Sequence, residues 1–178
     1  MTDIFLTALI FAAALLYSSV GHAGASGYLA AMALLGIAPD VMKPTALVLN
    51  ILVATLVTVK FYQAGWVQWS MFWPFAIASI PLSFLGGSLS LPSTLYKPIV
   101  GVVLIYAAYR LFRASQTDTP TSAKAIPLPA ALISGGSIGL LSGLTGVGGG
   151  IFLSPLILLM GWAPPKPTAG VSAAFILV

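Results

Sequence analysis

The feature that most constrains this chain is the apolar segment at its start, residues 4–39, which contains no charged residue. A continuous helix of that length would measure about 50 Å, whereas the hydrocarbon core of a bilayer is about 30 Å thick. The segment must therefore be interrupted, and Gly21, Gly24 and Gly27 lie near its middle, where glycine most readily breaks a helix. The pattern predicts a helix over residues 4–20, a break over 21–27 and a second helix over 28–37.

Composition places the chain in a membrane. Only 6% of its 178 residues are charged and 59% are hydrophobic, whereas a soluble domain has about 25% charged residues. Apolar stretches near 20 residues, rather than alternating ten-residue segments, indicate helices and not a barrel. With no cysteine, one histidine and three acidic residues, we expect no disulfide, no thiol catalysis, no cofactor and no bound metal. The net charge of +4 comes from loops and does not indicate nucleic-acid binding.

The rest of the chain alternates apolar segments with polar connections. After a polar loop at residues 40–43, we expect a helix over 44–61 that begins at Pro44, because proline fits the first helical position. Two further helices are expected over 67–90 and 96–113. An aromatic belt at a membrane interface is expected from Phe61, Tyr62, Trp66, Trp69 and Trp73. The predicted organisation is a first transmembrane repeat (1–113), a polar linker (114–126) and the start of a second repeat (127–178).

Three landmarks recur in the same order in both halves. The glycine cluster GHAGASG has a counterpart in TGVGGG 124 residues later. The turn G-x-A-P at 36–39 recurs at 161–164, and the tetrad K-P-T-A at 43–46 recurs at 166–169. Ordered matches of this kind indicate duplication. We therefore expect an all-α polytopic membrane protein of two homologous repeats with interrupted helices around glycine-rich breaks. The second repeat is expected to be incomplete, because the sequence stops at Val178 inside a helix that is expected to begin at Pro167.

Basic residues set the expected orientation. Arg110, Arg113 and Lys124 lie at the polar linker and favour the cytoplasm for it. No Lys or Arg precedes Lys43, which favours an N-terminus outside. That arrangement requires an odd number of crossings in the first half, and hence inverted repeats. Four crossings with an inside N-terminus remain the alternative if the segment 28–37 is re-entrant.

The two glycine breaks are the candidate binding site. Hydrocarbon cannot satisfy the backbone groups that a broken helix exposes, so these must line a cavity or bind a ligand. The N-termini of the half-helices carry partial positive charge and favour anions. The candidate substrate-binding residues are Gly24, Ser26, Gly27, Gly148, Gly149 and Gly150 at the breaks, with His22, Thr45, Asn50 and Thr168 as further polar groups. Lys43 and Lys166 are candidates for the mouths of an anion path.

Each kind of candidate also has an ordinary structural role. Glycines permit close helix packing, which we expect for Gly139 and Gly143 at their G-x-x-x-G spacing. The alternative for the lysines is an interfacial anchor that reaches back to water. For the threonines it is a hydrogen bond within the helix, and for His22 it is simple packing.

Three other functions fit parts of the sequence. A secretory signal peptide cleaved after Ala25 would need a basic start, whereas this chain begins Met1-Thr2-Asp3. Gly24-Ala25-Ser26-Gly27 looks like the nucleophile motif of rhomboid intramembrane proteases. That reading needs a base on a later helix, and the single histidine, His22, precedes Ser26. A non-transporting membrane assembly subunit is the third alternative, although nothing in that role requires paired breaks.

The second glycine cluster carries a family resemblance. The run Gly146-Val147-Gly148-Gly149-Gly150 with the following Pro155-Leu156 and the turn at 161–164 resembles the sulfite exporter TauE/SafE family. The first cluster departs from that pattern at His22 and Ser26 and has Ala31 in place of the proline. The resemblance implies a bacterial inner-membrane permease, not an enzyme, for small anions such as sulfite or organosulfonates. We expect alternating access between the repeats, with the bilayer and the anion as partners and a homo-oligomer left open.

Overall fold

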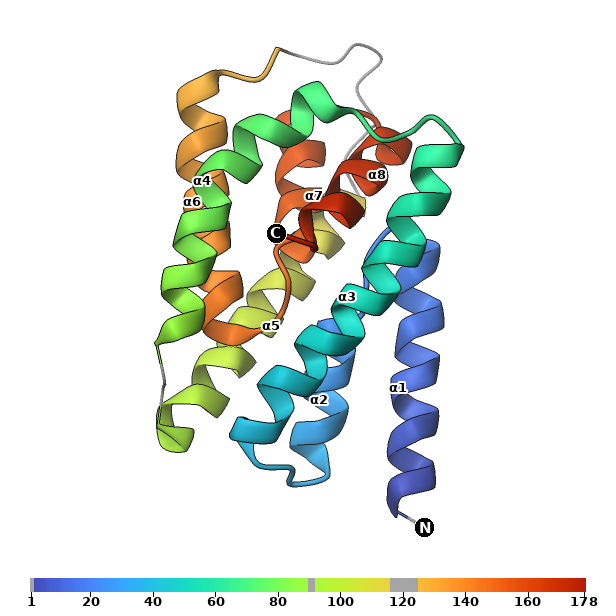
Figure 1. The fold of residues 1–178 in the computed structure, drawn as a ribbon, viewed down its shortest axis with the longest axis vertical. Helices are drawn as coiled ribbons and strands as arrows, with labels where there is room; N and C mark the ends of the chain where they lie inside the picture. Colours follow the sequence, from blue (N-terminus) through green and yellow to red (C-terminus); the bar gives the residue numbers. More distant parts are fainter. Residues whose placement is uncertain (1, 90–91, 116–124) are drawn as a thin grey trace.

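The computed structural model describes residues 2–89, 92–115 and 125–178, and within these ranges its regular structure is entirely helical (Figure 1). The helices are α1 (Thr2–Ser19), α2 (Ala25–Leu34), α3 (Pro39–Gln63), α4 (Trp69–Ser88), α5 (Ser93–Ser115), α6 (Leu128–Thr145), α7 (Gly150–Met160) and α8 (Pro165–Phe175). The predicted all-α architecture is confirmed. Most of the predicted polar linker, including Lys124, lies outside the described residues.

The outer surface of the helices is apolar. Ile4, Phe84 and Ile105 each leave more than two thirds of their area exposed, at 76%, 77% and 72%. Large contiguous apolar surfaces of this kind are rare on soluble proteins and normal on proteins that face lipid. The helices α3, α4 and α6 are long and apolar enough to cross a membrane. The chain is therefore a helical membrane protein, as the composition predicts.

The helices run in alternating directions along the molecule. In Figure 1, α1 rises from the N-terminus, α2 descends and α3 rises again. Further along the chain α6 descends, α7 rises and α8 descends. Each of the last three helices thus runs opposite to the helix that sequence landmarks pair with it: α6 with α1, α7 with α2, and α8 with α3.

Glycines on one face of α6 bring this helix close to α4. A Cβ added at Gly139 would lie 2.6 Å from the carbonyl oxygen of Ser79, which is closer than real Cβ atoms approach. Cβ atoms added at Gly135 and Gly143 would likewise meet the backbone of α4, at Phe75 and Ser83. The expected packing role of Gly139 and Gly143 is confirmed, and the four-residue spacing explains it, because residues four apart lie on one helix face.

The first break is shorter than predicted. It covers residues 20–24, and Ala25, Ser26 and Gly27 form the first turn of α2 instead of belonging to the break. Helical hydrogen bonding begins at Gly24, whose carbonyl accepts from the N–H of Tyr28 at 3.0 Å. Gly27 has a different task, since a Cβ there would lie 2.7 Å from Cβ of Ala13 on α1. It allows the two helices of this hairpin to approach each other.

Two helix starts were also predicted too late. Helix α3 begins at Pro39 rather than Pro44, so the predicted polar loop at 40–43 is wrong and forms the first turn of the helix. Helix α8 begins at Pro165 rather than Pro167. In both cases an earlier proline takes the first helical position, where its missing N–H costs no hydrogen bond.

The predicted aromatic belt lies around the connection between α3 and α4. Tyr62, Trp66, Trp69 and Trp73 are all partly exposed there, and Trp69 contacts the ring of Phe72 edge to face at 5.3 Å. Their gathering at one end of the molecule agrees with an interfacial position, which stays a prediction.

Candidate functional site

Two breaks interrupt the helices, and left-handed glycines shape both of them. The first break, residues 20–24, contains Gly21 and Gly24 with φ of 83° and 95°. The second break, residues 146–149, contains Gly146 and Gly148 with φ of 75° and 84°. Residues with a side chain rarely adopt these values, so glycine is needed at all four positions. Each break ends at the N-terminus of a short helix, α2 in the first case and α7 in the second.

The two breaks meet inside the molecule. The imidazole Nε2 of His22 in the first break lies 3.2 Å from the carbonyl oxygen of Gly150, the first residue of α7. Each break also packs on the K-P-T-A segment of the other half. A Cβ at Gly21 would lie 2.6 Å from Cβ of Ala169, and a Cβ at Gly146 would lie 3.0 Å from Cγ of Lys43. Each break is thus held by a helix start from the other half of the chain: the first break by α8 and the second break by α3.

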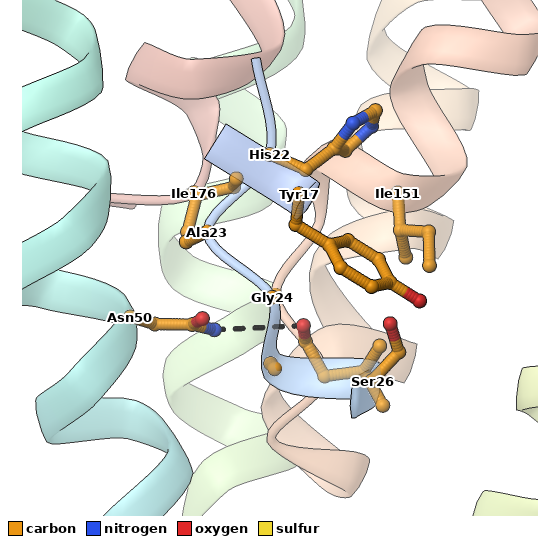
Figure 2. Close-up of a pocket in the computed structure, with 11 residues that line it drawn as sticks. Tyr17, His22, Ala23, Gly24, Ser26, Asn50, Ile151 and Ile176 are labelled. Carbon is orange, nitrogen blue, oxygen red and sulfur yellow. Dashed lines mark hydrogen bonds between the residues drawn. The ribbon is translucent and has the colours of Figure 1, made fainter. Parts of the chain in front are cut away.

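A small cavity lies between the breaks (Figure 2). Its volume is about 10 Å³, which is room for about one water molecule. The first half contributes Tyr17, His22, Ala23, Gly24, Ala25, Ser26 and Asn50, and the second half contributes Val147, Gly148, Ile151 and Ile176. The cavity therefore lies at the junction of the two halves, where the N-terminal turns of α2 and α7 converge. The first N–H groups of a helix have no acceptor within the helix and are available to a ligand.

Two polar side chains at this cavity lack partners. The hydroxyl of Ser26 and the Oδ1 atom of Asn50 are both buried, and neither has a hydrogen-bond partner in the described part of the chain. Ser26 is only 7% exposed and Asn50 only 2%. The Nδ2 group of Asn50 donates to the carbonyl of Val147 at 3.5 Å, the dashed line in Figure 2. A buried polar atom without a partner costs about 1–3 kcal/mol, so such a pair indicates a binding site.

A second polar cluster, which the sequence alone did not predict, adjoins the cavity. The hydroxyl of Ser154 on α7 lies 3.0 Å from Nε2 of His22 and donates to the hydroxyl of Ser172 on α8 at 2.8 Å. Ser154 follows Gly150 by one helical turn, which places its side chain on the face that meets the first break. That spacing was visible in the sequence, but the contact with His22 depends on the crossing of the two breaks.

The hydrogen bonds of this cluster fix the proton on His22. A carbonyl oxygen only accepts, so Nε2 must carry the hydrogen that points to Gly150. The hydroxyl oxygen of Ser154 then accepts a hydrogen bond from the same N–H, and the hydroxyl of Ser154 donates a hydrogen bond to the hydroxyl of Ser172. His22 is therefore not placed to remove a proton from Ser154, and the three residues form a structural clasp between the first break, α7 and α8.

Two buried tyrosines hold the carbonyls at the breaks. The hydroxyl of Tyr28 on α2 donates to the carbonyl of Ala23 in the first break. The hydroxyl of Tyr96 on α5 donates to the carbonyl of Thr145, the last residue of α6, at 2.7 Å. These bonds satisfy backbone groups that the interrupted helices leave open. Neither tyrosine was singled out from the sequence, because nothing local distinguishes it from a core aromatic.

The remaining glycine and threonine candidates lie beside the cavity and do not line it. Gly149 and Gly150 pack on α8, where added Cβ atoms would lie 2.5 Å from Cε1 of Phe175 and 2.7 Å from Cγ1 of Ile176. The hydroxyl of Thr168 donates to the carbonyl of Pro164 at 2.9 Å, a bond within its own helix. Thr45 is half-buried on α3 and is not among the residues around the cavity.

The two lysines lie near opposite ends of the molecule, at the starts of α3 and α8 (Figure 1). Nζ of Lys43 donates to the carbonyl of Gly87 at 3.2 Å. Lys166 is exposed, and its Nζ lies 5.1 Å from the centre of the Trp66 ring. Among the described residues, no three His, Asp or Glu side chains come together as a metal site would require.

Comparison with known proteins now assigns the chain to a family. The model of the sulfite exporter TauE/SafE family matches residues 6–178. The chain belongs to the sulfite exporter TauE/SafE family. It is also 46% identical over 171 residues to the probable membrane transporter protein y4hK of Sinorhizobium fredii (strain NBRC 101917 / NGR234), a match that covers 94% of this chain and 69% of that protein. No solved structure matches the chain.

This TauE/SafE member is a membrane transporter and not an enzyme. The geometry around Ser26 agrees, because His22 makes its Nε2 bonds to Gly150 and Ser154 and none to Ser26. The protease alternative therefore lacks the activated serine that it requires. The predicted family resemblance is confirmed over nearly the whole chain.

Proposed function

We propose that this TauE/SafE member moves small oxoanions, of the sulfite or organosulfonate class, through the junction of the two breaks. The family description names sulfite, and the y4hK relative is described as a probable membrane transporter. The observation that carries the proposal is the pair of unpartnered buried groups, Ser26 Oγ and Asn50 Oδ1, at a cavity onto which two helix N-termini converge. N-terminal N–H groups and the helix dipole both favour negative charge.

The proposed mechanism is alternating access between two inverted repeats. Its first support is direction, since α6, α7 and α8 run opposite to α1, α2 and α3 (Figure 1). Its second support is local: Gly36 and Gly161 both have positive φ, and the N–H groups of Ile37 and Trp162 close equivalent 3.0 Å bonds to Met32 and Ile157. Transporters built from inverted repeats bind substrate at the junction of the repeats and expose it to each side in turn.

The observed state corresponds to a closed step of this cycle. A cavity of about 10 Å³ is smaller than a sulfite ion, so the two breaks must separate for the anion to enter. Separation on one side parts Gly21 from Ala169, and separation on the other parts Gly146 from Lys43. Lys43 and Lys166, at the two ends of the molecule, would attract anions to the two entrances. We place this transporter in a bacterial inner membrane, with the bilayer and the anion as its partners.

The proposal is tested by flux into proteoliposomes. Purified protein is reconstituted, and uptake of radiolabelled sulfite and methanesulfonate is compared with uptake by empty vesicles. We expect uptake that saturates with substrate concentration and that Asn50→Leu reduces at least about fivefold, because the loss of a site acceptor costs about 1–3 kcal/mol. Absence of flux for every small anion would overturn the proposal.

A further inference from the structure

The orientation of the Asn50 amide determines which chemical group the cavity presents. Its Nδ2 group donates to the carbonyl of Val147 at 3.5 Å. The reverse orientation would place two acceptor oxygens against each other, so Oδ1 is the atom left without a partner. An amide oxygen can only accept a hydrogen bond. Asn50, which lines the cavity, therefore carries a buried acceptor that requires a donor.

Gly148 holds this amide in place. The backbone of Gly148 has φ of 84°, and a Cβ built there would lie 2.8 Å from Nδ2 of Asn50. The amide thus rests directly on the second break, where a side chain would displace it. Asn50 is also 2% exposed, which leaves its amide little freedom to turn.

The first turns of α2 and α7 and the hydroxyl of Ser26 offer donors at the cavity. The free N–H groups at the start of α2 and α7 can only donate, and the hydroxyl of Ser26 can donate. A fully deprotonated oxoanion offers acceptors to all of them but also turns an acceptor oxygen toward Asn50 Oδ1. A singly protonated oxoanion matches the whole set, because its hydroxyl donates to Asn50 while its other oxygens accept from Ser26 and the helix N-termini.

We infer that the transported species is a small oxoanion that carries one hydroxyl donor, such as hydrogensulfite, and that Asn50 Oδ1 selects it by accepting that hydroxyl. The inference rests on the proposed function and narrows its substrate class. Buried polar groups discriminate in this way because an analogue that lacks the donor leaves the acceptor unpaired in the closed site.

The test uses two anions that differ in one group. Hydrogensulfite and methanesulfinate both carry one negative charge and a sulfur with two further oxygens, and a methyl group in the second replaces the hydroxyl of the first. Flux of labelled hydrogensulfite into proteoliposomes, at a pH where this form predominates, is measured with methanesulfinate as competitor. We expect methanesulfinate to bind roughly tenfold more weakly than unlabelled hydrogensulfite, as an unpaired buried acceptor predicts.

Two variants identify the residue responsible. Asn50→Leu removes the acceptor and should bring the two competitors within about twofold of each other, chiefly by weakening hydrogensulfite. Ser26→Ala leaves Asn50 intact and should weaken both competitors while preserving the ratio between them. If Asn50→Leu does not fold, the competition between the two anions in the wild type still tests whether the hydroxyl is required.

Three outcomes would overturn the inference. Equal competition by both anions in the wild type would show that the protein does not distinguish a hydroxyl from a methyl group on the anion. A ratio that collapses in Ser26→Ala would assign the acceptor to Ser26 instead. A ratio that persists in a folded Asn50→Leu protein would remove Asn50 from the selection. In each of these cases flux continues, so the proposed transport function stands; loss of flux for all anions would remove both.

Discussion

The two breaks have the same role in the fold and are built in different ways. The first break and the turn after it carry polar side chains, with His22 bonded to the second half and Ser26 left without a partner. The second break contains only Gly146, Val147, Gly148 and Gly149 and contributes backbone. Asn50, which donates to the carbonyl of Val147 in this break, comes from α3 in the first half. The difference indicates that the first half supplies the polar side chains of the candidate site, whereas the second half supplies glycine backbone against which these side chains pack.

The largest expected effect comes from filling the second break. Gly148→Ala places a methyl group against the Asn50 amide in a left-handed backbone, and we expect at least a tenfold loss of anion flux. Gly36→Ala is the matched control, since Gly36 has φ of 74° but nothing lies within 4 Å of an added Cβ. It incurs only the backbone strain of about 1–2 kcal/mol. Equal losses of flux in the two variants, measured on the folded protein, would contradict a specific role for the second break.

Stability should respond more strongly to the first break than to the second. Gly21→Ala meets the backbone oxygen of Ala169 at 2.8 Å, which cannot move aside easily. Gly146→Ala meets the flexible side chain of Lys43 at 3.0 Å. Both positions have positive φ, so the strain of the backbone is shared, and the clash should cost Gly21→Ala about 1–3 kcal/mol more. Thermal unfolding in detergent measures the difference, and a lower melting temperature for Gly146→Ala would reverse the comparison.

The partnered and unpartnered serines should separate stability from transport. Ser154→Ala breaks the chain from His22 to Ser172 and should lower the free energy of unfolding by about 1 kcal/mol. Ser26→Ala removes a buried hydroxyl that has no partner, so stability should be unchanged or slightly higher while anion flux falls severalfold. Thermal unfolding and flux are measured on both variants. A Ser26→Ala protein that is destabilised and transports normally would assign Ser26 to the fold.

The smallest effect is expected at the two lysines. Lys43 lies against the second break and bonds the carbonyl of Gly87, whereas Lys166 is exposed over Trp66. Replacement of each by methionine should lower the rate of anion uptake about two- to threefold at low ionic strength, through lost attraction at the entrances. The effect should fade as salt is raised. Reduced uptake that does not depend on salt would indicate a packing role instead.

The sequence was sufficient for the all-α architecture and named several residues that line the cavity, but it did not predict how these residues are connected. Scarcity of charge and the spacing of glycines predicted a helical membrane protein with breaks, because lipid and backbone hydrogen bonding leave few other solutions. Gly24, Ser26, Asn50 and Gly148 were all named, since polar or flexible residues are conspicuous in apolar helices. The clasp from His22 to Ser154 and Ser172 was missed, because it joins residues more than 120 positions apart through the crossing of the breaks.

The direct test of the account is whether the cavity between the breaks lies on the transport path. The chain has no cysteine, so Ser26→Cys gives a single thiol that can be treated with a sulfonate-bearing methanethiosulfonate reagent under transport conditions. Ala54→Cys is the control, since Ala54 is fully buried one turn further along α3 than Asn50 and does not line the cavity. The account predicts that Cys at position 26 reacts and that anion flux stops, while Cys at position 54 stays unmodified. A position 26 that remains unreactive in a protein that is actively transporting would contradict it.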